Sequence, residues 1–98
     1  MTRLSPKAFR FVDAAVIRSE DEEIRAIWSG FKRERAQGLS NEVARAVLRA
    51  LQEAERDLGS RLELTSIGED EAADLSNDLG FIRAIKRDLH RQVGRDAK

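Results

Sequence analysis

The sequence contains no cysteine, no tyrosine, one tryptophan and a single proline among its 98 residues. Without cysteine, neither a disulfide framework nor a thiolate-ligated metal site can form. One proline and six glycines are too few for the closely spaced turns of a β-sandwich or a β-barrel. These absences exclude disulfide-stabilised folds and argue against an all-β fold.

Long hydrophobic runs are also missing. The longest wholly apolar run is Ala14 to Ile17, whereas a transmembrane helix needs about 20 apolar residues. The first residues, MTRLSPK, contain no apolar core of the kind that a signal peptide carries. We therefore expect no signal peptide, no membrane span and a cytoplasmic location.

Residues that carry catalysis or bind metals are scarce. His90 is the only histidine, and Lys86 and Arg87, one helical turn before it, would repel a metal cation. The sequence has no glycine-rich phosphate loop, no nucleophile elbow and no H-E-x-x-H motif. Carboxylate pairs such as Glu53 and Asp57 have the character of a solvated helix face rather than of an acid–base pair. We expect no enzymatic activity, no cofactor and no bound metal.

Charged residues make up 37% of the chain and apolar residues 41%, a balance typical of helices with one apolar and one charged face. Apolar residues recur at spacings of three and four along most of the sequence. The pattern predicts an all-α fold: a single domain, residues 1–98, forming a small bundle of four to five helices. The expected long helices span residues of about 6–18, 20–36, 40–58 and 77–93, with a short helix or loop at 60–75.

Capping signals set the expected helix boundaries. Ser5 can accept hydrogen bonds from the first turn of a helix, and Pro6 fits that turn because it has no N–H to satisfy. Ser19 and Glu22 have capping-box spacing and predict the start of the second helix. The other boundaries are expected at residues that commonly end or cap helices: Gly38, Ser40, Gly59, Ser76 or Asp78, and Gly94.

Trp28 lies next to Ser29 and Gly30, a triplet that could mark either a turn or a continuous helix. Ile24, Ile27, Trp28 and Phe31 fall at i, i+3, i+4 and i+7 and form one stripe of a helix. The stripe continues past the triplet, so we interpret Trp28 as a core residue and Gly30 as a tolerated helical glycine. The first helix is apolar around most of its circumference, which predicts a central position packed on more than one side.

The net charge is zero, with 18 basic and 18 acidic residues, but the charges are segregated. Two groups on the C-terminal part of the chain are candidate binding residues, since blocks of opposite charge favour docking onto a complementary surface. We call the first the arginine ridge: Arg83, Arg87, Arg91 and Arg95. We call the second the acidic segment: Glu69, Asp70, Glu71 and Asp74.

These features favour a non-enzymatic protein–protein interaction module, such as a small helical adaptor, inhibitor or immunity-type regulator. Its 14 arginines against 4 lysines suit interfaces, because a guanidinium can bind a carboxylate through two hydrogen bonds. The partner would be another protein or a second copy in a homodimer, which could cover the long apolar seams of the helices. The alternative is a nucleic-acid-associated regulator that binds phosphates through the arginine ridge.

Overall fold

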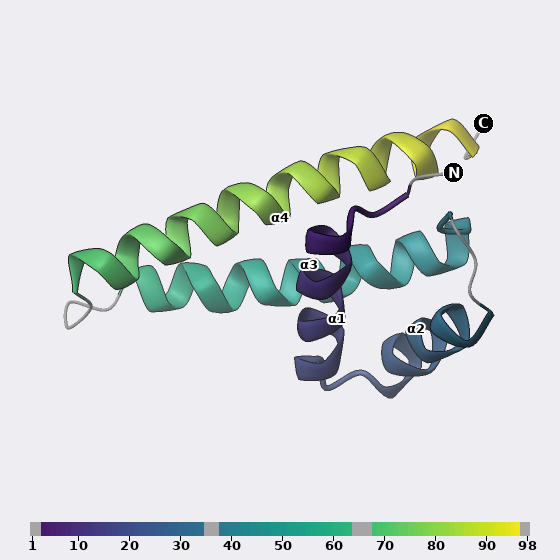
Figure 1. The fold of residues 1–98 in the computed structure, drawn as a ribbon, viewed down its shortest axis with the longest axis horizontal. Coiled ribbons are helices and arrows are strands. Elements are labelled where there is room, and N and C mark those ends of the chain that lie inside the picture. The colour runs from purple at the N-terminus through teal and green to yellow at the C-terminus, as the bar shows by residue number, and fades with distance from the viewer. Residues whose placement is uncertain (1–2, 35–37, 64–67, 97–98) are drawn as a thin grey trace.

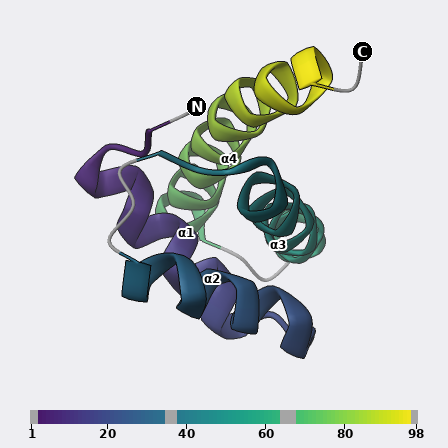
Figure 2. The same cartoon turned by 90° about the vertical axis from the view of Figure 1, so that its right-hand side faces the viewer.

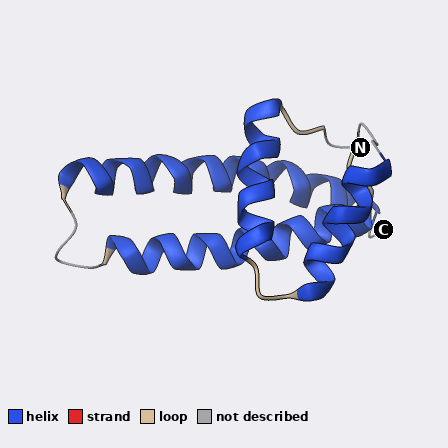
Figure 3. Cartoon of the chain, turned by 60° about the horizontal axis from the view of Figure 1, so that its bottom comes forward, coloured by secondary structure: helices blue, strands red, loops and turns tan. Residues whose placement is uncertain are grey.

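The computed structural model of the chain describes residues 3–34, 38–63 and 68–96. The described residues form helices joined by short connections, which confirms the expected all-α fold (Figure 3). The helices are α1 (Pro6–Arg18), α2 (Glu22–Glu34), α3 (Asn41–Leu62) and α4 (Glu69–Asp96).

The two long helices, α3 and α4, form an antiparallel hairpin that sets the 42 Å length of the molecule (Figure 1). Helix α1 crosses the hairpin near its middle, and α2 packs against α3 toward the end where that helix begins (Figures 1 and 2). The hairpin therefore has a covered half and a half that projects beyond α1. We call the projecting part, residues 53–62 of α3 and 69–79 of α4, the overhang.

Helix α1 packs on more than one side, as its apolar circumference predicts, but the predicted central position is wrong: α1 lies across the hairpin with one face exposed, and α3 is the central helix (Figure 1). Helix α1 begins as expected, with the Ser5 Oγ accepting a hydrogen bond from the Ala8 N–H at 3.1 Å. Val12 is completely buried in the common core. On either side of it, Phe9 contacts a ring of α2, and Phe11 contacts Phe81 of α4 edge to face, with ring centroids 5.2 Å apart. Because α1 also packs on α3, it touches all three other helices.

Trp28 lies in the core, as the stripe on the second helix predicts, and is only 2% exposed. Its ring lies between Phe9 of α1 and Phe31 of α2, at centroid distances of 5.3 and 5.2 Å. Helix α2 continues through Gly30, and a Cβ added there would meet no atom within 4 Å. The glycine is thus a tolerated helical residue, and the alternative of a turn at this triplet is wrong.

The start of α2 differs from the predicted capping box. The Asp21 Oδ1 accepts a hydrogen bond from the Glu23 N–H at 2.9 Å, so Asp21 caps the first turn. Ser19 instead ends α1, where its N–H donates to the Val16 carbonyl at 3.0 Å. The predicted pairing of Ser19 with Glu22 is wrong because Ser19 is held at the end of the preceding helix. Farther along, the expected cap at Ser40 is confirmed, since its Oγ accepts from the N–H of Val43 at 3.3 Å.

The expected boundaries in the hairpin are wrong in three places. Helix α3 runs through Gly59 to Leu62, and α4 begins at Glu69 rather than near residue 77. The predicted short helix or loop at 60–75 therefore belongs mostly to the two long helices, while residues 64–67 lie outside the described chain. A helical glycine costs only about 1 kcal/mol, and burial of Leu58 and Leu75 across the hairpin outweighs it. Helix α4 also continues past Gly94 to Asp96.

The apolar seams of α3 and α4 are buried within the single chain. Val47 and Leu51 of α3 and Ile82 and Leu89 of α4 are completely buried in one continuous cluster with the core of α1 and α2. These seams need no second chain to cover them.

Candidate interaction surfaces

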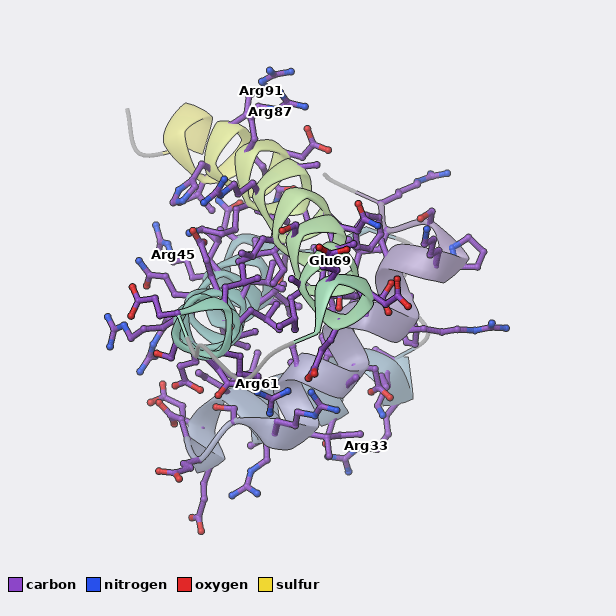
Figure 4. The ribbon with its side chains drawn as sticks, turned by 90° about the vertical axis from the view of Figure 1, so that its left-hand side faces the viewer. Arg33, Arg45, Arg61, Glu69, Arg87 and Arg91 are labelled. Atoms are coloured by element: carbon purple, nitrogen blue, oxygen red, sulfur yellow. The ribbon has the colours of Figure 1, made fainter. Side chains whose placement is uncertain are left out.

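The arginine ridge lies on the C-terminal half of α4, but its members differ in their surroundings. The Arg83 Nε lies 3.7 Å from Glu55 Oε1 of α3, so this guanidinium is partly engaged within the chain. Arg87 and Arg91 are exposed and point together away from the body of the molecule (Figure 4). Neither makes an ion pair within the described part of the chain. The side chain of Arg95 lies outside the described residues.

The acidic segment lies at the opposite end of the same helix. Its residues are all exposed on the first two turns of α4: Glu69, Asp70, Glu71 and Asp74. Eighteen residues of α-helix separate Glu69 from Arg87, which corresponds to about 27 Å along the axis. The two charged groups are therefore not brought together within the chain. Each is open to a second molecule.

Two ion pairs link α3 to α4 near the start of the overhang. The half-buried Lys86 Nζ donates to Glu55 Oε2 at 2.8 Å, and Arg83 lies beside the other oxygen. The hydrogen bond from Lys86, helped by the charges of both bases, holds the pKa of Glu55 below its ordinary value. Sequence inspection did not find this group, because Glu55 and Lys86 are 31 positions apart and only the hairpin brings them together. The group is a cross-link within the fold.

A second polar group joins α1 to α2. Asp13 Oδ1 accepts hydrogen bonds from the indole Nε1–H of Trp28 at 2.8 Å and from Lys32 Nζ at 2.9 Å. These two donors, with the indole first, hold the pKa of Asp13 below its ordinary value. Asp13 interrupts the apolar surface of its helix in the sequence, and its role is to satisfy the one polar atom of the buried tryptophan.

A hollow of the described surface lies in a corner between α1 and the overhang, which sequence inspection did not identify. It encloses about 640 Å³ and is open to solvent on one side. Its apolar lining comes from two helices: Phe11, Ala14 and Ala15 of α1, and Ala54 and Leu58 of α3. Its rim is charged and contains Arg18, Glu20, Glu53, Asp57 and Arg61. We call this hollow the apolar corner.

The apolar corner arises because the buried stripe of α3 is longer than the helices that cover it. Val47 and Ala50 lie beneath the covering helices and are buried, and the same stripe continues as Ala54 and Leu58 in the overhang. The spacing of three and four was visible in the sequence. The point at which α1 crosses α3 was not, because it depends on how the helices pack.

Three further features are not found among the described residues. They contain no group of three or more His, Cys, Asp or Glu side chains able to hold a metal ion, and His90 is exposed. No buried side-chain nitrogen or oxygen among them lacks a hydrogen-bond partner. None of the described helices is long and apolar enough to cross a membrane.

Comparison with known proteins identifies no relative. No family model, no curated protein and no solved structure matches the chain. The surfaces described above are therefore the basis for any functional assignment.

Proposed function

We propose that this protein is a non-enzymatic protein-binding module whose docking surface is the apolar corner. The observation that supports this function is the stripe of α3 that continues into the overhang, where the half-buried Ala54 and the 9% exposed Leu58 line a hollow of about 640 Å³. An apolar floor within a charged rim is the usual composition of a protein interface. The module would act as an adaptor or as an inhibitor that covers a site on a larger partner.

The shape of the apolar corner favours a helix as the docked element. Its two walls are helices, and three of its five apolar lining residues are alanines, which leave room for larger side chains of a partner. A partner helix would insert apolar residues at spacings of three and four and place its polar residues on the rim. Residues of both charges on the rim would select among candidate partners more than they would add affinity.

Site-specific photocrosslinking in the native host tests this proposal. A photoreactive residue in place of Ala14, within the apolar corner, should yield covalent adducts with a partner protein. The matched control places the same residue at Arg45, an exposed position of α3 outside the corner (Figure 4). Adducts from position 14 and none from position 45 support the proposal. Equal yields at the two positions, or no adducts at all, contradict it.

Nucleic-acid binding is a second candidate, and the exposed pair of Arg87 and Arg91 favours it. Both guanidinium groups are exposed and make no ion pair within the described chain, so they could contact phosphates. Binding of duplex DNA, followed by fluorescence anisotropy at two salt concentrations, tests it. Two phosphate contacts imply a slope of about −2 in log K against log salt. Absence of binding near 100 mM salt would remove this candidate.

A further inference from the structure

We propose that the partner in the apolar corner is α1 of a second copy of this chain. In the resulting dimer, each α1 lies between its own α3 and the overhang of the partner's α3. This inference rests on the proposed function, because it names the occupant of the same surface. Three features of the described residues support it: an exposed apolar face on α1, the length of the overhang, and the charges on the two surfaces.

The first feature is the outer face of α1. Ile17 is 64% exposed and is the one large apolar side chain that stands exposed on the described surface. Ala14 and Arg10 precede it at spacings of three and seven and lie on the same side of the helix. At 100° per residue, this side is roughly opposite the buried Val12 and Val16. Helix α1 therefore has a second face able to pack while the first remains in its own core.

The second feature is the length of the overhang. The α3 residues that line the corner run from Glu53 to Arg61, which corresponds to about 12 Å of helix. A helix with its side chains is about 10–12 Å wide. The overhang thus offers space for one helix laid beside α1, and Ala15 and Ala54 allow that helix to approach closely.

The third feature is charge. The outer face of α1 carries the exposed Arg10, whereas Arg18 lies on the rim of the corner. The rim of the corner carries Glu20 and Glu53, which make no ion pair within the described chain, whereas Asp57 is paired with a neighbouring arginine at 3.3 Å. A second copy of α1 would therefore bring Arg10 toward Glu20 and Glu53 of the rim.

The proposed arrangement is closed by symmetry. Each copy contributes one α1 face and one corner. With two-fold symmetry, the α1 face of each copy fills the corner of the other, and no such surface remains free to bind a third copy. Helix α1 has only 13 residues, so the buried area lies at the small end of specific interfaces. We accordingly expect a reversible dimer with a dissociation constant weaker than about 1 µM.

Sedimentation equilibrium of the full chain, from about 1 µM to about 500 µM, measures this association. The mass should rise from near 11.1 kDa toward twice that value. Ile17→Glu places a carboxylate against an acidic rim and should weaken the dimer at least about tenfold. Its matched control is Ala84→Glu, which adds the same charge at an exposed position on α4. Circular dichroism verifies that both variants remain helical.

Charge exchange gives a second and independent readout. Arg10→Glu should weaken the dimer, and Glu53→Arg in the same chain should restore part of the lost association.

A wild-type chain that stays monomeric throughout the range overturns the inference, as does an Ile17→Glu variant that dimerises like Ala84→Glu. A monomer that still forms photocrosslinked adducts with another protein from position 14 overturns self-association and leaves the protein-binding function standing. A monomer without adducts contradicts both.

Discussion

The covered half of the α3–α4 hairpin and the overhang are built from the same two helices and the same apolar periodicity, yet they are buried to different degrees. In the covered half, Leu51 and Ile82 are completely buried beneath α1 and α2. In the overhang, Leu58 and Leu79 each retain 9% of their exposure, and Leu75 retains 7%. Two packed helices bury each other's side chains only along their line of contact. Complete burial of a side chain requires a third helix.

Under the proposed function, this difference separates stability from binding within one hairpin. The covered half packs with α1 and α2 into the core, which contains Trp28 of α2 and its hydrogen bond to Asp13 of α1. The overhang carries an apolar surface whose covering is incomplete, bounded on one side by α1. Changes in the covered half should reduce the free energy of unfolding of the whole domain. Changes in the overhang should cost less stability and affect association more.

The largest loss is expected from Trp28→Ala, in the core that α1 and α2 form over the covered half. Removing a ring that is 2% exposed should reduce the free energy of unfolding by about 3–5 kcal/mol, a large share of the total for a domain of this size. Urea unfolding followed by circular dichroism measures it. Trp28→Phe is the control, because it keeps an aromatic ring and loses the hydrogen bond to Asp13. A wild-type fluorescence maximum like that of free tryptophan would contradict the burial on which the prediction rests.

A matched pair of leucines compares the two halves directly. Leu51→Ala should cost about 4 kcal/mol, because the cavity is enclosed by three helices. Leu75→Ala should cost about 2 kcal/mol, since water and neighbouring side chains can fill the space in the overhang. Both values come from urea unfolding at a concentration where the chain is monomeric. Equal losses at the two positions would show that the overhang is as well packed as the covered half.

Acid should weaken the link between α1 and α2. The pKa of Asp13 is lowered in the folded chain, so its hydrogen bonds stabilise the fold at pH values above the unfolded pKa, about 3.9. This stabilisation is lost as the pH falls from about 5 through the lower folded pKa. Asp13→Asn should remove about 1 kcal/mol at neutral pH and make unfolding less dependent on pH below 5. A variant with an unchanged acid profile would contradict this role.

The smallest effect is expected at the ion pairs of Glu55, near the start of the overhang. Glu55→Gln removes the charge that holds Lys86 and Arg83, and should cost at most about 1 kcal/mol because the group is partly solvated. The lowered pKa of Glu55 implies that the same contribution fades as the pH falls below about 4, the ordinary range of a glutamate. Thermal unfolding at low and high salt measures it. A loss comparable with that of Leu51→Ala would contradict this account.

Much of the covered half could be predicted from the sequence. Periodicity located α1, the stripe of α2 and the burial of Trp28, and local chemistry identified Ser5 and Ser40 as caps. Those signals depend on neighbouring residues along the chain, which is why they are readable. The start of α2 was misassigned because Ser19 and Asp21 are both polar residues able to cap the first turn of the helix, and Asp21 is the one that does so.

The overhang was less predictable because its structure depends on tertiary contacts. Gly59 has the local character of a helix end, yet α3 continues through it because Leu58 and Leu62 pack across the hairpin. The apolar corner exists only because α1 crosses α3 before the apolar stripe ends. The exposure of Ile17 was equally hidden, since the apolar circumference of α1 does not reveal which residue remains uncovered.

Amide hydrogen exchange at a low and a high protein concentration tests the division of the hairpin most directly. At low concentration, amides at 55–62 and 72–78 should exchange at least about tenfold faster than those at 44–51 and 82–89. At high concentration, protection should rise at 8–18 and 53–61 and stay unchanged at 44–51. Uniform protection along both helices, with no dependence on concentration, would contradict both the weaker overhang and its proposed role in binding.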